Sequence, residues 1–366
     1  MRHLPLLALA LLGASCTGPA SDADSASSYR PIIVSDDVAL PPHESFSPAS
    51  LSHEPFSSDT VLGQPGTLVV HDGLLWVVDY SGEPWLHALD TASGRVAWSG
   101  GQRGEGPGQF GMINGLGPAG TPATLWAFDA NARRFTAIDT TLGGIVNPEL
   151  VGFTMPGRLS RATPFGDGTF FGLQMLPPDS GHAVVVDRTG AITDSGDWPF
   201  LGGDSVPRLE RMLASGGSLG VVLCAHPNGA RAAVAYSAAG RIDLFDSTAQ
   251  HVGAAEVPFP ADAAFSVGDD GSLHASRPRF WYRDCTATAE HLFALFSGRR
   301  WDDYDPPDGS AAEFVHVFAW DGRLVRVLHL DQQVAQIGVS ADGRTLYAVP
   351  MGEAAIIRYA VPAIEE

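Results

Sequence analysis

Five charged side chains are the best candidates for a binding site, because the repeat structure of the chain does not account for them. They are Arg103, Glu105, Arg133, Arg299 and Arg300. The chain contains no lysine, and its 22 basic residues face 41 acidic ones, for a net charge of −19. Neighbouring arginines would form a local positive region, and a guanidinium fork suits a carboxylate or a sugar acid. The alternative is that these arginines neutralise nearby aspartates or cap turns.

Two glycine motifs resemble catalytic or cofactor signatures without the elements that those signatures need. The stretch GPGQFG at residues 106–111 fits the dinucleotide fingerprint, but MINGLGPAG follows it and cannot form the required helix. The stretch GGSLG around Ser218 leads into a strand, whereas a nucleophile elbow leads into a helix. The absence of lysine also removes pyridoxal phosphate and P-loop chemistry. We therefore expect no cofactor and assign no catalytic residue.

Metal ligands are scarce in the pattern of the chain. Four aspartates crowd the stretch 302–308, but EF-hand spacing is absent and Arg299 and Arg300 stand close enough to neutralise them. The twelve histidines are scattered, without a metalloprotease motif. His226, at the end of an inner strand, is the best single candidate, and a hydrogen-bonded wall residue is the favoured interpretation. We expect no metal site.

Cys224 and Cys285 each lie shortly before a repeated strand, and we expect them at matching places on the inner strands of neighbouring blades. A disulfide between them is one alternative. Two buried thiols, behaving as small apolar groups, are the favoured one.

The elements that must position these residues are short strands that recur about every 50 residues. One strand pattern begins at Leu75, Leu125, Phe170, Ala232, Leu292 and Leu346, and a partner strand ending in Asp or an aliphatic residue follows each copy. These strands are apolar on both faces, as expected for sheets that are covered on both sides. Glycine-containing turns join them. The pattern predicts an all-β, six-bladed β-propeller, whose last blade is closed by a strand from the N-terminal side, between Glu44 and Leu62.

Two stretches resemble known repeat families. GQRGEGPGQF, at residues 101–110, resembles the linking segment of NHL-type repeats. HLFALFSGRR from His291, VHVFAWDGRLVRVLHLD from Val315 and ADGRTLYAV from Ala341 look like the TolB-like six-bladed lipoprotein propellers of bacteria. The resemblance implies a propeller fold and an envelope location in a bacterium, and it leaves the function open.

The N-terminal residues read as a secretory signal. An apolar run from Leu4 to Leu12 precedes Gly13, Ala14, Ser15 and Cys16, which resembles a bacterial lipobox with Gly13 in place of the usual Leu. This predicts a signal peptide at residues 1–15, a lipid-carrying Cys16 with a flexible tether through residue 43, and a propeller over residues 44–366. Ordinary cleavage that leaves a free thiol is the alternative.

Taken together, the sequence predicts an exported propeller, lipid-anchored at the outer membrane or its periplasmic face. We expect a monomeric, non-catalytic binding or scaffold protein whose partner is a protein or a small anionic or carbohydrate ligand. Nucleic acid is excluded by the acidic charge balance, and contact with the membrane would come from the N-terminal lipid alone. The alternative function is a propeller hydrolase or lyase with its site at the channel mouth.

Overall fold

A computed structural model gives the structure of this chain. It describes residues 43–56, 62–106, 108–118, 124–132, 134–140, 158–166, 168–176, 180–187, 189–197, 220–237, 239–260, 264–267, 273–276, 279–300 and 312–364. Ile32–Glu366 form one compact unit, and the description below concerns this unit. In the described part of the chain, no helix is long and apolar enough to cross a membrane.

The first half of the unit is built from antiparallel sheets that follow one another along the chain. The first contains β3 (Pro65–His71), β4 (Leu74–Asp79), β5 (Leu86–Asp90) and β6 (Val96–Gly100). A short parallel pair, β7 (Gln102–Arg103) and β8 (Gln109–Phe110), leads to a sheet of β9 (Ile113–Pro118), β10 (Thr124–Asp129) and β11 (Arg134–Asp139). The next contains β12 (Arg158–Phe165), β13 (Thr169–Leu176), β14 (Ser180–Val186) and β15 (Ile192–Asp197).

The second half continues the pattern. One sheet contains β16 (Val221–Ala225), β17 (Arg231–Tyr236), β18 (Ile242–Asp246) and β19 (His251–Ala254), and a separate pair is formed by β20 (Ala264–Val267) and β21 (Leu273–Ser276). The last sheet runs β22 (Tyr282–Ala287), β23 (His291–Phe296), β24 (Ala312–Ala319), β25 (Leu324–Val339), β26 (Thr345–Pro350) and β27 (Ile357–Ala360). The first part of the 16-residue β25 pairs with β24 and its last part pairs with β26.

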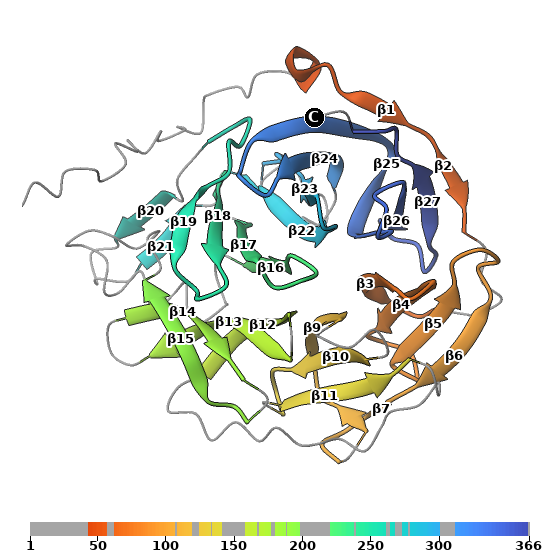
Figure 1. The fold of residues 1–366 in the computed structure, drawn as a ribbon. Helices are drawn as coiled ribbons and strands as arrows, with labels where there is room; N and C mark the ends of the chain where they lie inside the picture. Colours follow the sequence, from red (N-terminus) through yellow and green to blue (C-terminus); the bar gives the residue numbers. More distant parts are fainter. Residues whose placement is uncertain are drawn as a thin grey trace, which may run out of the picture. The chain divides into compact units, whose positions relative to one another are not determined.

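The first strands of these sheets form a closed ring around a central axis (Figure 1). Strand β3 lies beside β9, β9 beside β12, β12 beside β16, β16 beside β22, and β22 beside the end of β25, which in turn lies beside β3. The approach of neighbouring strands is close at some points. A Cβ atom at Gly115 of β9 would overlap the carbonyl oxygen of Ala162 in β12. The architecture is an all-β propeller, and the repeated strand stretches predicted from the sequence are all strands.

The hydrophobic core is divided into clusters between consecutive sheets. Phe171 and Tyr236 belong to the cluster between the β12–β15 and β16–β19 sheets, and Trp126 packs with Phe170 in the cluster before it. The burial pattern of β23, in which all six residues are buried, follows from this arrangement, because both faces of the sheet are covered. Trp76 and Trp126 are 1% and 4% exposed, so their repetition serves packing between sheets.

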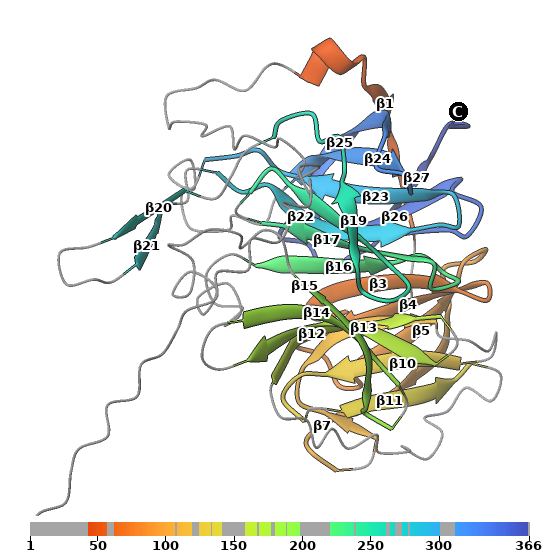
Figure 2. The same ribbon diagram turned by 60° about the vertical axis from the view of Figure 1, so that its left-hand side comes forward.

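An N-terminal strap, defined here as residues 43–56, lies along the outer strands of the last sheet (Figures 1 and 2). It contains η1 (His43–Phe46), β1 (Ala49–Leu51) and β2 (His53–Pro55). Strand β1 pairs in parallel with β25, and β2 pairs antiparallel with β27. Strand β2 lies between Glu44 and Leu62, the stretch from which the sequence predicts a closing strand.

Candidate functional site

The inner strands surround a cavity of 720 Å³. Its walls are made of residues from β3, β9, β12, β16, β22 and the end of β25, and most of these residues are small, aliphatic or hydroxylated. Against this neutral lining stand three arginines, Arg161, Arg279 and Arg283, and one carboxylate, Asp284. A positive lining is unusual for a chain with a net charge of −19. This contrast makes the cavity the candidate site.

Tyr80 marks the end of the cavity where the charged residues gather. Its hydroxyl donates to the Ile113 carbonyl at 3.0 Å and lies 3.3 Å from the Thr67 hydroxyl, so it connects the beginnings of β3 and β9. Burial raises the pKa of Tyr80, while the charge of Arg161 lowers it and that of Asp284 raises it. All three groups are therefore electrostatic neighbours at one end of the channel.

Arg161 is a half-buried cation on β12. Its Nη1 donates to the side-chain oxygen of Asn114 at 3.3 Å, and the Asn114 amide nitrogen donates to the Met112 carbonyl at 3.0 Å. No carboxylate lies within ion-pair distance of Arg161 among the described residues. Burial lowers the pKa of this guanidinium, but an arginine remains charged at neutral pH. Among the described residues, the side-chain hydrogen-bond partner of this positive charge is the neutral amide of Asn114.

The other two arginines come from the chain around the start of β22. Arg279 donates from Nη1 to the Gly298 carbonyl at 2.7 Å, which fixes it to the neighbouring connection. The guanidinium of Arg283 lies 4.9 Å from the ring centre of Phe280, a cation–π distance. Both therefore have defined positions in the wall.

Asp284 follows Arg283 and reaches toward the end of β25. Its Oδ2 accepts the backbone N–H of Ile337 at 2.8 Å. Burial raises the pKa of Asp284 to about 7, although the hydrogen bond from Ile337 and the charge of Arg283 act in the opposite direction. The Asp284 side chain is half-buried and borders the cavity.

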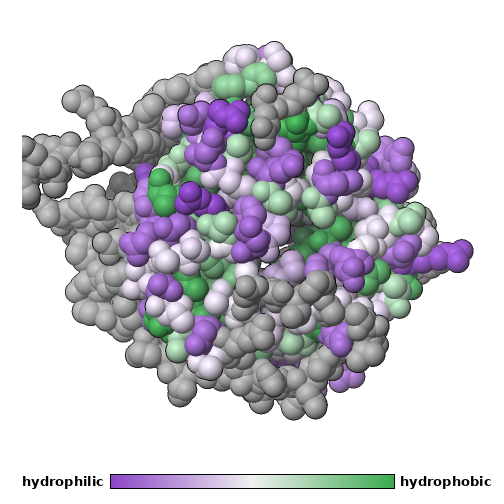
Figure 3. Space-filling view, viewed as in Figure 1, coloured by the Kyte–Doolittle hydropathy of each residue, from purple (hydrophilic) through white to green (hydrophobic). Residues whose placement is uncertain are grey.

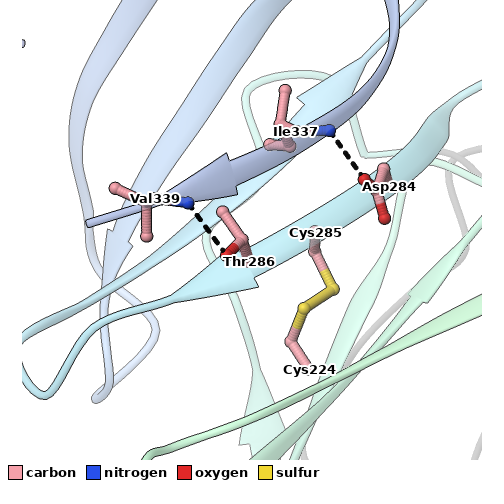
Figure 4. Close-up of a disulfide and its surroundings, with 6 residues drawn as sticks. All are labelled: Cys224, Asp284, Cys285, Thr286, Ile337 and Val339. Carbon is pink, nitrogen blue, oxygen red and sulfur yellow. Dashed lines mark hydrogen bonds between the residues drawn. A yellow bond between two sulfur atoms is a disulfide. The ribbon is translucent and has the colours of Figure 1, made fainter. Parts of the chain in front are cut away.

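Strand β22 is tied to both of its neighbours by side chains (Figure 4). Thr286 Oγ1 accepts the N–H of Val339 at 3.4 Å, two residues along from the Asp284 contact. Between them, Cys285 points the other way and forms a disulfide with Cys224 of β16, with Cα atoms 6.0 Å apart. The sequence favoured two free thiols here, and the structure has the bridge instead. The inner strands β16 and β22 are far apart in the sequence but lie close enough in the fold for a disulfide. The spacing of the two cysteines in the sequence does not predict this proximity.

Of the five residues that the sequence singled out, the four that the structure describes do not line this cavity. Arg103 lies with its guanidinium 5.5 Å from the ring centre of Trp85, and Glu105 is exposed. Arg299 Nη2 is 3.7 Å from Glu313 Oε2, and its guanidinium also donates to the Gln333 side-chain oxygen. The backbone of Arg300 pairs with that of Arg279 as an isolated antiparallel β-bridge. Arg133 lies outside the described residues.

Arg134, the neighbour of Arg133, is a buried structural residue. It donates to the carbonyl oxygens of Glu105 and Gly106, each at 2.9 Å, and to that of Gln109. It thereby holds the glycine-rich connection between β7 and β8. The contact ties this loop to the start of β11.

His226, the best single candidate for a metal ligand in the sequence, is held by backbone groups. His226 Nε2 contacts the Ala289 carbonyl at 2.9 Å and its Nδ1 lies 3.2 Å from the Asn228 amide nitrogen. Both ring nitrogens are thus used by backbone groups, as in the favoured wall interpretation. No group of three or more possible metal-binding side chains is found in the described part of the chain. The acidic stretch 302–308 lies outside it.

Arg161, Arg283 and Asp284 were missed by sequence reasoning. The available signal was a charged residue inside an inner strand, in RLSRATPF at residues 158–165 and in YRDCTA at residues 282–287. Inner strands of the repeat differ too much in sequence for that signal to be recognised beside the well-matched second and third strands.

Comparisons with known proteins concern the fold alone. No protein-family model matches the chain, and no curated protein matches it either. Among solved structures, a luciferin-regenerating enzyme matches with a TM-score of 0.50 and 11% identity, over 86% of this chain and 97% of that one. Regucalcin from Agrobacterium tumefaciens, described as a calcium-binding protein, matches with a TM-score of 0.46 and 14% identity, over 85% and 95%. The Cps50 (Swd1) β-propeller domain from Myceliophteria thermophila matches with a TM-score of 0.48 and 12% identity, over 85% of this chain and 100% of that one.

At these identities the likeness supports the fold and says nothing about a ligand or a reaction. The ring of inner strands and the match to a solved propeller structure agree with each other. The chain is a β-propeller with a cation-lined central cavity.

Proposed function

We propose that this protein is a non-catalytic binding propeller that holds a small organic anion in its central cavity. The observation that carries the proposal is Arg161. Arg161 is half-buried, and a charge that is partly removed from water is costly unless a partner compensates it. The described residues near Arg161 supply only the neutral Asn114 amide as a side-chain hydrogen-bond partner. A carboxylate or sugar acid entering the cavity would supply the missing negative charge, and a guanidinium can hold it with two hydrogen bonds.

The rest of the site supports the same ligand class. Arg279 and Arg283 line the same cavity, and Asp284 is the only carboxylate among its described lining residues. The surface of the face shown in Figure 3 favours a small ligand over a large apolar partner. Hydrophilic and hydrophobic residues are interspersed over the coloured part of the face in Figure 3, without one continuous hydrophobic area. A protein partner bound through polar contacts remains the second form of the binding hypothesis.

We propose that the propeller has six blades. We count six blades by dividing the last sheet at β25, whose first part would be the outer strand of one blade and whose last part the inner strand of the next. Strand β2 would then be the outer strand of the sixth blade, supported by its pairing with β27. A TolB-like or NHL-type propeller is the family that suits this arrangement.

The location of the protein is proposed from its N-terminal sequence. Residues 1–15 would be a signal peptide, Cys16 the lipid-carrying residue and the following segment a flexible tether to a monomeric propeller at the outer membrane or periplasmic face. Wild-type protein expressed in a bacterium should partition into detergent and incorporate labelled palmitate, and Cys16→Ala should do neither. Equal partitioning of both proteins would remove the anchor.

The binding proposal is tested with Arg161→Gln. Calorimetric titration with glucuronate at slightly acidic pH should give binding to the wild-type protein and a loss of at least about tenfold in affinity for the variant, since a charged hydrogen bond contributes roughly 1.5–3 kcal/mol. Arg103→Gln is the matched control, because Arg103 lies beside Trp85 and outside the cavity. Equal affinity of the wild type and Arg161→Gln would contradict the proposal.

One observation favours an enzyme as the second candidate. A carboxyl with a pKa of about 7 inside a cavity is suited to general acid–base catalysis. A propeller hydrolase or lyase would use Asp284 in that role. Turnover of a sugar-acid ester or lactone that Asp284→Asn abolishes, with binding retained, would favour the enzyme over the binding protein.

A further inference from the structure

Asp284 lies beside the arginines of the cavity, so its charge state would change how strongly these arginines attract an anion. Along β22, Asp284 and Thr286 point toward β25, and Cys285 between them points toward β16 (Figure 4). One carboxyl oxygen of Asp284 is occupied by the Ile337 N–H. The carboxyl also borders the cavity. The backbone N–H of Cys285 acts on the same carboxylate as a second donor, and a ligand would approach the carboxyl from the cavity.

The groups that face Asp284 come from several elements. Arg283 on its own strand acts on it as a charge, and Ile337 of β25 donates to it. Tyr80, from the end of β4, has a pKa that Asp284 raises and Arg161 of β12 lowers, so these groups share one electrostatic region. The Cys224–Cys285 disulfide on the other side of β22 does not titrate. Positive charges outnumber the negative one around the cavity.

We propose that the cavity takes up its anionic ligand together with one proton, and that Asp284 holds this proton. The inference rests on the proposed function and assigns its pH regulation to one side chain. An ionised Asp284 compensates part of the arginine charge and repels an entering anion. A protonated Asp284 can keep its carbonyl oxygen on the Ile337 N–H and offer its hydroxyl hydrogen to the ligand.

The direction of the effect follows from linkage. The pKa of Asp284 is raised to about 7 by burial, and an anion held by the neighbouring arginines raises it further, because a second negative charge disfavours ionisation. The complex therefore binds more protons than the free protein, and binding tightens as pH falls. Between the pKa of the free protein and the higher pKa of the complex, affinity should drop by up to about tenfold for each pH unit, and outside that window affinity should be constant.

The test is calorimetric titration of the full chain with glucuronate and, separately, with sulfate, anions that stay ionised from about pH 6 to about pH 8.5. Titrations in two buffers of different ionisation enthalpy count the protons taken up. Proton uptake by the wild-type protein should be largest, up to one proton per anion, at pH values between the pKa of the free protein and that of the complex. Asp284→Asn should bind either anion without proton uptake and with an affinity that does not change with pH.

Thr286→Val is the matched control, because it removes the equivalent contact to Val339 without changing a titrating group. It should keep the pH dependence of the wild-type protein. Binding without proton uptake by the wild type, or an unchanged pH dependence in Asp284→Asn, would overturn this inference and leave anion binding intact. Failure of both anions to bind at about pH 6, where Asp284 would be protonated, would overturn the proposed function and this inference with it. The proton count on the wild-type protein stands even if the variant folds poorly.

Discussion

The Asp79 carboxylate lies 2.6 Å from the backbone nitrogen of Gly63 and so joins the end of β4 to the connection before β3. It also accepts from the amide groups of Gln64, Ser81 and Gly82. Asp129 repeats the arrangement one sheet later, with Gly111 and Met112 on one side and Asn131 and Ala132 on the other. The carboxylate of each aspartate thus accepts hydrogen bonds from two loops at the same end of its sheet and holds them together.

Asp79→Asn should therefore be strongly destabilising. The amide nitrogen of asparagine would face backbone N–H groups that need an acceptor, and hydrogen bonds to charged groups contribute roughly 1.5–3 kcal/mol. We expect the free energy of unfolding in urea to fall by about 2–3 kcal/mol. Asp90→Asn is the control, because Asp90 caps an exposed turn through Ser93. A loss of the same size in both variants would contradict the role of Asp79.

The pH dependence of Asp79 has a definite sign. Four backbone hydrogen bonds lower its pKa below the usual 3.8, against the opposing effect of burial. The unfolded chain therefore binds the proton first as pH falls. The contribution of Asp79 to stability is present above 3.8 and is lost as pH falls through the lower pKa of the folded protein.

Sequence reasoning succeeded where local pattern determines structure. The second and third strands of each sheet are buried on both faces, so their apolar runs repeat visibly, and Asp79 and Asp129 keep the same offset within them. The candidate site could not be predicted in this way. Which side chains of β12 and β22 line the cavity depends on how neighbouring sheets pack and on how the ring closes. Both arise from contacts between residues far apart in the chain, such as Cys224 with Cys285, 61 positions apart, and Asp284 with Ile337, 53 positions apart.

The disulfide between Cys224 and Cys285 should stabilise the ring across a sequence separation of 61 residues. In the chain-entropy description a bridge over a loop of this length contributes roughly 4 kcal/mol, and measured values are commonly 2–4. The double variant Cys224→Ala/Cys285→Ala should thus lose about 2–4 kcal/mol in urea unfolding. Dithiothreitol should lower the melting temperature of the wild type and leave that of the double variant unchanged. Sensitivity of both proteins to dithiothreitol would place the effect elsewhere.

The N-terminal strap should be required for a stable last sheet. Leu51 and Phe56 are buried, and β2 pairs with β27, so removing this segment exposes a strand edge and apolar surface. Deletion of residues 44–62 should cause loss of soluble protein or of several kcal/mol in stability. Deletion of residues 17–29 is the control and should have little effect. Equal stability of the two deletions would show that the edge is protected by another segment.

A point variant separates the backbone pairing of the strap from its exposed ion pair. Arg358 Nη2 lies 3.2 Å from Glu54 Oε2, and both side chains are partly exposed. Exposed pairs contribute about 1 kcal/mol or less. Arg358→Gln should therefore change the melting temperature little. A loss comparable to that of the deletion would assign the stabilisation to the charge pair.

Protonation of His43 should loosen the strap in acid. Its ring stacks on Phe314 with centroids 3.7 Å apart, and its Nε2 lies 3.4 Å from that of the buried His316. Burial lowers the pKa of His43 from 6.5 to about 4, while Glu44 raises it and His329 lowers it. Burial, and secondarily the charge of His43, lowers the pKa of His316 as well.

Between about pH 6.5 and about pH 4, His43 is protonated in the unfolded chain and neutral in the folded protein. The free energy of unfolding therefore decreases as pH falls through this window, and the contribution of neutral His43 is fully present above it. His43→Phe keeps an aromatic ring against Phe314 and removes the titrating group. Urea unfolding at several pH values should show a smaller loss in acid for this variant than for the wild type, with the remaining loss owed to His316. Glu44→Gln should act in the opposite direction, because the charge that supports protonation of His43 in the folded state is gone. Identical pH profiles for the wild type and His43→Phe would mean that acid acts on this protein through other groups.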